Sequence, residues 1–142
     1  MGKLMDDIVN TADNFAKGFG EAMGYTFDYS FESLAEVDDL LDDVRSSEKD
    51  EDVLYNVYTM SGCYVFETAR RNYGGEYFWL EDEQQPILVA GEPEFSVSIK
   101  AWEKTKGFLE NGAEDSLSFY IAGYKEHIEK GKEQKGYRAL IV

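Results

Sequence analysis

Thiol and imidazole side chains are almost absent from this sequence, which holds one cysteine, Cys63, and one histidine, His127. A single cysteine forms no internal disulfide, so nothing in the composition requires an oxidising compartment. One residue of each kind also excludes the familiar zinc sites, which combine several Cys and His ligands. A Ser-His-Asp triad would depend on His127 alone, and no G-x-S-x-G turn presents a serine. We expect Cys63 to be a small buried side chain and His127 to lie at the surface or near a helix end.

Basic residues are scarce as well, and the shortage is uneven along the chain. There are 14 Lys and Arg against 29 Asp and Glu, a formal net charge of −15. Between Asp28 and Asp52, eleven acidic residues meet two basic ones, so this stretch alone carries a net charge of −9. Repulsion from phosphates argues against nucleic acid as a partner. A basic protein partner fits this charge, although acidic surfaces also serve solubility alone.

Long apolar runs and phosphate-binding loops are missing too. No apolar run approaches the length that crosses a bilayer, and the first residues lack the apolar core of a secretory signal. The GxxxxGK[ST] pattern is absent, and Gly18-Phe19-Gly20 follows no strand and has Met23 in place of a third glycine. We therefore expect a cytoplasmic protein with no membrane contact and no cofactor.

Helical periodicity dominates what is present. A chain of 142 residues with 43% hydrophobic residues and two prolines indicates one folded domain, residues 1–142. The segment 51–73 is apolar on two sides, which is typical of a central helix, and Gly62 within it suits close packing against a neighbour. Apolar spacing, capping residues and glycines predict helices over about 3–23, 34–44, 51–73 and 101–110, and from 114–115 to Gly131.

Extended segments gather in the second half of the chain. Gly74-Gly75 ends the long helix, and residues 76–90 read as an antiparallel hairpin around a polar loop. Residues 95–99 form either a third strand or an extended lead-in to the next helix, and 136–142 form a last strand. Helices and strands fall in largely separate blocks, which indicates the α+β class. We expect about four to five helices packed on a small, mainly antiparallel sheet made of the hairpin 76–90 plus the C-terminal strand.

The acidic stretch coincides with the predicted second helix. Ser30 or Ser33 can cap it, and Ser33-Leu-Ala-Glu36 has the capping-box pattern. Asp39, Asp42 and Asp43 fall on neighbouring positions of its surface, outside the apolar stripe. Calcium loops take ligands from irregular backbone that contains glycine, which this segment lacks, so we expect no metal site. We interpret the three aspartates as a solvated face that is also able to meet a basic partner.

A charged group interrupts the apolar stretch GCYVFETARRNYGGEYFW, residues 62–79. Glu67 precedes Arg70 by three residues and Arg71 by four, which are spacings that favour ion pairs on a helix. We expect Glu67 and Arg71 to form a desolvated pair, because a buried charge needs a partner, and Arg70 to reach solvent. One interpretation is an ion pair that fixes how the hairpin leaves the helix. The other is an arginine at a pocket mouth that meets a carboxylate or phosphate.

Several of these residues form an arrangement that resembles a known family. DYSFESLAEVD at 28–38, GCYVFE at 62–67 and RNYGG at 71–75, followed by an aromatic strand, resemble small bacterial domains of unknown function. Those domains share a DYSxxSLxxVD helix entry and a GxYxGExxxRNxGG helix that leads into a hairpin. Here Phe66 replaces the small residue usual before the glutamate. The resemblance covers about half of the chain, implies a bacterial cytoplasmic origin and carries no known activity. Some small acidic proteins of similar architecture look like immunity proteins of contact-toxin systems, an analogy of fold alone.

Two classes of function follow from these patterns. The first is a non-enzymatic protein-interaction domain, immunity-like or regulatory, whose acidic helix over 33–44 meets a basic partner. The alternative is a small-molecule-binding protein or carboxylate-based enzyme with a pocket between the helix 51–73 and the hairpin, using Tyr64, Glu67, Arg71 and Trp79. A DNA mimic, with carboxylates spaced like phosphates, is a third option. No catalytic residue is assigned, and the candidate ligand- or partner-binding residues are Asp39, Asp42, Asp43, Glu67, Arg70, Arg71 and Trp79.

Overall fold

The computed structural model describes residues 2–142 of the chain. These residues contain five α-helices and four β-strands. The helices are α1 (Lys3–Met23), α2 (Leu34–Ser47), α3 (Glu51–Tyr73), α4 (Ala101–Asn111) and α5 (Leu117–Glu133), with a 3-10 helix over Gly112–Asp115. The strands are β1 (Glu76–Leu80), β2 (Gln85–Ala90), β3 (Ser96–Ile99) and β4 (Arg138–Ile141). The predicted α+β class, with helices packed on a small sheet, is confirmed.

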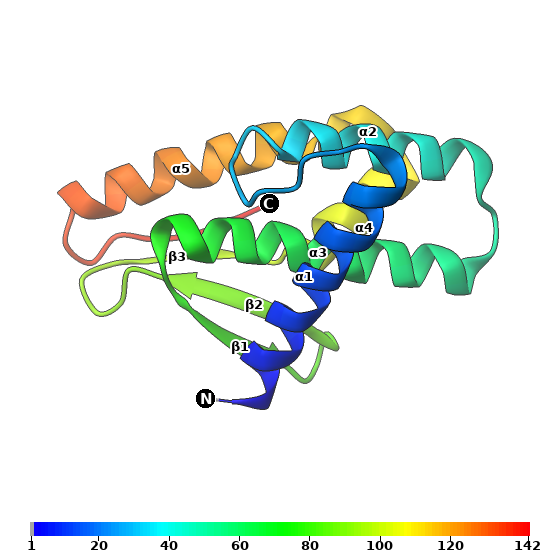
Figure 1. Cartoon of the computed structure of the whole chain (residues 1–142). Coiled ribbons are helices and arrows are strands. Elements are labelled where there is room, and N and C mark those ends of the chain that lie inside the picture. Colours follow the sequence, from blue (N-terminus) through cyan, green and yellow to red (C-terminus); the bar gives the residue numbers. More distant parts are fainter. Residues whose placement is uncertain (1) are drawn as a thin grey trace.

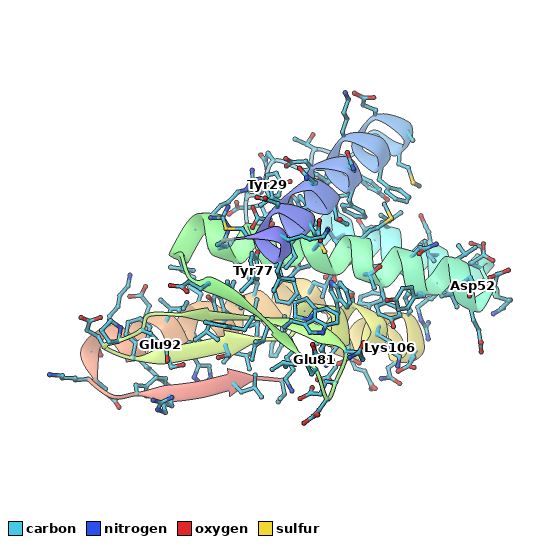
Figure 2. The ribbon with its side chains drawn as sticks, turned by 90° about the horizontal axis from the view of Figure 1, so that it is seen from below. Tyr29, Asp52, Tyr77, Glu81, Glu92 and Lys106 are labelled. Atoms are coloured by element: carbon cyan, nitrogen blue, oxygen red, sulfur yellow. The ribbon has the colours of Figure 1, made fainter. Side chains whose placement is uncertain are left out.

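The sheet has the order β1-β2-β3-β4 and is mainly antiparallel. Only the pair β3 and β4 is parallel. A parallel pair needs a crossover connection, which α4 and α5 supply here. Tyr77, Leu88, Ile99 and Ile141 are aligned across the four strands and so share one face of the sheet. The helices gather on one side of the sheet (Figure 1). Seen from below, Glu81 and Glu92 mark opposite ends of the hairpin region (Figure 2).

α3 is the central helix of the molecule, as its two apolar sides predict. Every residue from Ser61 to Ala69 is buried. α1 crosses α3 on one side, and α4 packs against it on another (Figure 1). A Cβ atom at Gly62 would lie 2.6 Å from Cδ1 of Trp102, so only glycine allows α4 to approach this closely. The close packing predicted for Gly62 is therefore confirmed.

Aromatic packing fixes the segment between α1 and α2 over the middle of α3. The ring of Tyr64 is fully buried, with ring centroids 5.6 Å from Phe15 and 5.2 Å from Phe27. Tyr29 stacks on the same tyrosine at 4.8 Å. This packing brings the segment that follows α1 next to the charged residues of α3.

α2 begins at Leu34 as predicted, and the hydroxyl of Ser30 accepts from the Ser33 amide at 3.2 Å, but the predicted Ser33 cap and the predicted start of α5 are wrong. Ser33 has helical dihedral angles and makes no capping bond, because its hydroxyl bonds instead to the backbone carbonyl of Ser30 and to the Tyr64 hydroxyl. The Glu36 carboxylate accepts from the backbone of Thr26, so the capping box does not form. α5 begins at Leu117 rather than at 114–115, because the residues before it form the 3-10 helix.

Candidate functional site

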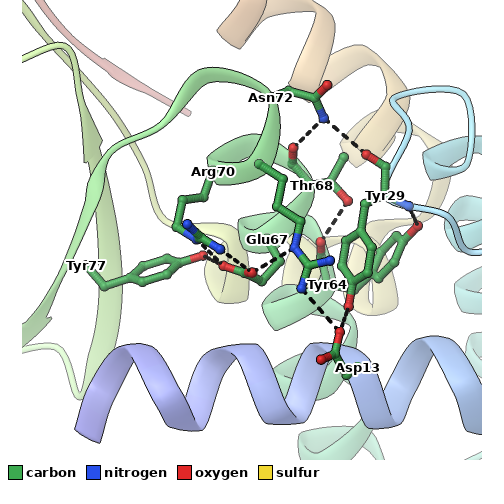
Figure 3. A network of polar contacts seen from close by, with 9 residues as sticks. Asp13, Tyr29, Tyr64, Glu67, Thr68, Arg70, Asn72 and Tyr77 are labelled. Carbon is green, nitrogen blue, oxygen red and sulfur yellow. Dashed lines mark hydrogen bonds and ion pairs between the residues drawn. The ribbon is translucent and has the colours of Figure 1, made fainter. Parts of the chain in front are cut away.

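Glu67 lies fully buried at the centre of a polar network formed by α1, α3 and β1 (Figure 3). Arg70 donates to both of its carboxylate oxygens, from Nε at 2.6 Å and from Nη2 at 2.9 Å. Nε of Arg71 donates at 3.0 Å, and the hydroxyl of Tyr77 donates at 2.8 Å. Four hydrogen bonds from three side chains thus satisfy one buried carboxylate.

The structure confirms one expectation about this group and corrects others. Glu67 and Arg71 do form a pair, as their spacing predicts. Arg70 was expected to point away from Glu67 to solvent; its side chain is 24% exposed, but it turns to Glu67 and holds it with two bonds. The pair of Glu67 and Arg71 was expected to be desolvated, yet Arg71 is the more exposed of the two arginines, at 35%. A fully buried carboxylate needs more donors than Arg71 supplies, and Arg70, one helical turn away, provides them.

Arg71 extends the network to α1. Its Nη2 donates to Oδ1 of Asp13 at 3.2 Å, and its guanidinium lies 3.7 Å from the centroid of the Tyr29 ring. Tyr29 has a φ of 64°, a left-handed conformation that bulky residues resist. Its amide donates to the Tyr64 hydroxyl at 2.9 Å, and its carbonyl accepts from Asn72 at 3.1 Å. These contacts hold Tyr29 in place against the strain.

The charges in this network are fixed rather than poised for proton transfer. Burial works to raise the pKa of Glu67, but the hydrogen bonds from Arg70, Tyr77 and Arg71 outweigh it and hold the pKa below its ordinary value. Burial raises the pKa of the Tyr77 phenol, and the neighbouring Glu67 charge raises it further. Near neutral pH the carboxylate therefore stays ionised and the phenol stays protonated. Neither group has the pKa near neutrality that general acid or base catalysis favours.

A hollow of about 350 Å³ does lie between the first half of α3 and the hairpin, but its lining leaves out the four residues named for it. Five surface hollows have linings that leave out Tyr64, Glu67, Arg71 and Trp79. Trp79 is 38% exposed and packs edge-on against Trp102, with ring centroids 6.0 Å apart. The geometry therefore favours the interpretation of Glu67, Arg70 and Arg71 as an ionic joint between α3, α1 and the hairpin.

The aspartates of α2 lie elsewhere and have different environments. Asp39, Asp42 and Asp43 are exposed, and their carboxylates bond to no other group among residues 2–142. Asp38 instead accepts from the Leu117 amide at 2.7 Å, as well as from the amide of Ser118 and the hydroxyl of Ser116. Asp38 thus joins α2 to the start of α5, while its three neighbours face solvent.

An apolar groove of about 510 Å³ runs between α2 and α5, which lie side by side (Figure 1). Its lining is mainly apolar, with Glu32 on the α2 side and Lys125 on the α5 side. Phe119, on the first turn of α5, is 81% exposed. The residues that line the groove are Phe31, Glu32, Ala35, Ser118, Ile121, Ala122 and Lys125.

The partners that reach the Glu67 network from other elements escaped the sequence-based prediction. Asp13 and Tyr29 approach Arg71 from more than forty residues away, and nothing in local spacing indicates such a contact. Tyr77 offered a weak signal, because it is a polar aromatic side chain just after the glycine pair that ends α3. The expectation of a buried Cys63 is confirmed, and burial raises the pKa of its thiol to about 11.

Among residues 2–142, no three His, Cys, Asp or Glu side chains converge as a metal site requires. In the same range, no helix combines the length and the apolar character needed to cross a bilayer.

Comparison with the models of known protein families, with curated proteins and with solved structures finds no match for this chain. The resemblance to small bacterial domains noted from the sequence stays a prediction.

Proposed function

We propose that this protein is a non-enzymatic protein-interaction domain that binds a basic, amphipathic segment of a partner protein on α2 and α5. The observation that carries the proposal is the junction of an apolar groove with unpaired carboxylates. Ala35 lines the groove, and Asp39 and Asp42 follow it by four and seven residues. These spacings place all three residues on one stripe of α2. A segment seated in the groove would therefore meet both aspartates.

The groove supplies the apolar part of such an interface. Ile121 and Ala122 form its α5 side, and the other side is formed by Ala35 of α2 and by Phe31, three residues before α2 begins. Phe119 precedes Ala122 by three residues and stands almost free of contacts, at 81% exposure. Exposed aromatic side chains beside a groove are typical anchors of protein interfaces. An amphipathic helix that lies in a groove is a recurrent mode of recognition.

The carboxylates that form no ion pair within the fold determine which kind of partner this surface attracts. Asp13, Glu67 and Asp115 already form ion pairs with residues of this chain. Asp39, Asp42 and Asp43 have no such partner among residues 2–142. The overall charge of −15 would steer a basic partner toward the molecule and repel nucleic acid. In this proposal the domain is immunity-like or regulatory and acts in the bacterial cytoplasm, where the lone Cys63 stays reduced.

The test compares variants in quantitative binding, after affinity capture from the native host has supplied a partner and that partner has been purified. We expect the change of Asp39, Asp42 and Asp43 to Asn to weaken binding at least about tenfold, because two charge contacts and a neighbouring negative charge are lost. We expect Phe119→Ser to weaken it as well.

The matched control changes Glu81→Gln, Asp82→Asn and Glu92→Gln, which removes the same charge from exposed sites away from the groove. This control should bind nearly as the natural protein does. Equal weakening by both triple variants would show that binding depends on the net charge of the protein and not on the position of the α2 aspartates. Binding that ignores the α2 aspartates and Phe119 would refute the proposal.

A further inference from the structure

A second hollow, of about 350 Å³, lies where the first half of α3, the loop between β1 and β2, and the start of α4 meet. Lys106 and Glu81 mark this end of the molecule, and Glu92 marks the opposite end (Figure 2). The hollow is separate from the groove between α2 and α5 and shares no lining residue with it. Its volume is near the lower end of the range for small-molecule sites.

Three aromatic rings form the apolar part of the hollow. Tyr55 and Tyr58 of α3 meet edge to face, with ring centroids 5.3 Å apart. Trp102 of α4 supplies the third ring, and Trp79 packs edge-on against it. Tyr55 is 50% exposed, so its ring is available to a ligand. The faces of aromatic rings carry negative electrostatic potential and attract cations.

Two carboxylates lie beside these rings. Glu83 accepts from Lys100 at 2.7 Å, which leaves its charge partly compensated. Glu103 forms no ion pair within residues 2–142, although Lys106 also lines the hollow. Acidic and aromatic side chains at the same site favour an organic cation over an anion or a neutral ligand.

Gln85 adds a polar side chain to the wall of the hollow. The residue is 8% exposed and lines the hollow, and its Nε2 donates to Glu83 at 3.0 Å and to Glu103 at 3.5 Å. The other amide atom, Oε1, is buried and has no donor within residues 2–142. A buried acceptor without a donor is costly and uncommon in folded proteins. Because Oε1 has almost no exposed surface, it adds to the negative potential of this wall without contacting a ligand.

We propose that this hollow binds an alkylammonium group. The positive charge stacks against Tyr55, Tyr58 and Trp102 and faces Glu103. Such a group occurs in free small cations and in dimethylated lysine side chains of proteins. Both sources present the same chemistry to the hollow, and the proposal does not depend on the partner of the α2–α5 groove.

Tryptophan fluorescence provides the measurement, because the chain holds two tryptophans, one in the hollow and one packed on it. The probes are choline, its neutral isostere with a tert-butyl group in place of trimethylammonium, and short peptides with dimethylated or unmodified lysine. We expect choline and the dimethyl-lysine peptide to shift the emission saturably, and the neutral isostere to have no effect. Tighter binding of the peptide would identify a protein side chain as the source, and tighter binding of choline a free cation.

Two exposed positions give variants that leave the core intact. We expect Tyr55→Leu and Glu103→Gln each to weaken binding of the cation about three- to tenfold, as the loss of one cation–π or charge contact implies. Glu92→Gln, the same charge change at the far end of the sheet, should leave binding unchanged. Equal binding of the neutral isostere, insensitivity to both variants, or no saturable shift with any cationic probe would overturn the proposal.

Discussion

Glu67 illustrates how a charged residue is kept in the interior of this protein. Its carboxylate is fully buried and receives bonds from Arg70, Arg71 and Tyr77. Taking such a group out of water is costly unless its lone pairs are satisfied. Two of the donors also connect Glu67 to other elements, since Tyr77 belongs to β1 and Arg71 also donates to Asp13 of α1. The network therefore joins three elements through one carboxylate.

Loss of the Glu67 charge should destabilise the protein strongly. We expect Glu67→Gln to lower the free energy of unfolding at neutral pH by about 3 kcal/mol, because two partly buried guanidinium groups lose their counter-charge. Urea denaturation of the two proteins measures this difference. A change below about 0.5 kcal/mol would show that the network contributes little to stability.

The same residue predicts a pH dependence. The pKa of Glu67 is held below its ordinary value of 4.5 in the folded protein. As the pH falls below that value, the unfolded chain binds the proton first, so the contribution of Glu67 to stability is lost in acid. We expect the difference in unfolding free energy between the natural protein and Glu67→Gln to shrink as the pH falls below 4.5. A difference that stays constant with pH would contradict the ionised state of Glu67.

Spacing within one helix made part of this network predictable. Glu67 and Arg71 are four residues apart on α3, and the helix brings them together whatever else the chain does. Asp13 and Tyr77 join through tertiary packing, which local spacing does not reveal. The direction of the Arg70 side chain was predicted wrongly. Helical periodicity gives the direction in which a side chain leaves the helix, but not the number of donors that a buried carboxylate needs.

Gly62 and Gly123 offer a matched pair within helices. A Cβ atom at Gly62 would meet Trp102 at 2.6 Å, whereas one at Gly123 of α5 would meet nothing within 4 Å. We expect Gly62→Ala to lower the free energy of unfolding by about 1 kcal/mol or more, because overpacking outweighs the better helix propensity of alanine. Gly123→Ala should raise it by about 0.5 to 1 kcal/mol. Thermal or urea denaturation measures both, and equal effects at the two sites would refute the packing role of Gly62.

Asp38 and Asp39 are neighbours with opposite roles. Asp38 bonds to the first amide groups of α5, where the helix dipole also favours a negative charge. We expect Asp38→Ala to cost about 1 kcal/mol, as removal of a helix cap does. Asp39→Ala should change stability by less than about 0.5 kcal/mol, because its side chain is exposed. Similar losses at both positions would show that Asp38 does not act as a cap.

Helices proved easier to predict than their connections. The periodicity of α1 and α3 gave both helices with the bounds seen in the structure. The parallel pairing of β4 with β3 was not foreseen, because it depends on the path of α4 and α5 between the two strands. The predicted start of α5 was also wrong. The carboxylate of Asp38 in α2 accepts from the Leu117 amide, so the helix begins there, after the 3-10 turn. Contacts between distant segments decide such features.

The acidic residues of the whole molecule include some that are paired within the fold and others that are left without a partner in the residues that the structure describes. Asp13, Glu67 and Asp115 are paired within the fold, whereas the α2 aspartates remain free of partners among residues 2–142. The free set borders an apolar groove, which the composition alone did not reveal. The acidic stretch from Asp28 to Asp52 predicted a candidate surface, and the structure adds the apolar residues of α5 that complete it. Sequence periodicity could not supply these, because the pairing of α2 with α5 is a tertiary contact.

The most direct test of the proposed binding surface is its footprint on the protein. Amide chemical shifts of the isotope-labelled protein would be recorded while the purified partner is added. We expect the largest changes at Ala35, Asp39, Asp42, Phe119 and Ala122, along α2 and α5. Few changes are expected around Glu67, whose network is internal. Changes centred on the Glu67 network, or none on α2, would contradict the proposal that this protein binds its partner through the acidic groove.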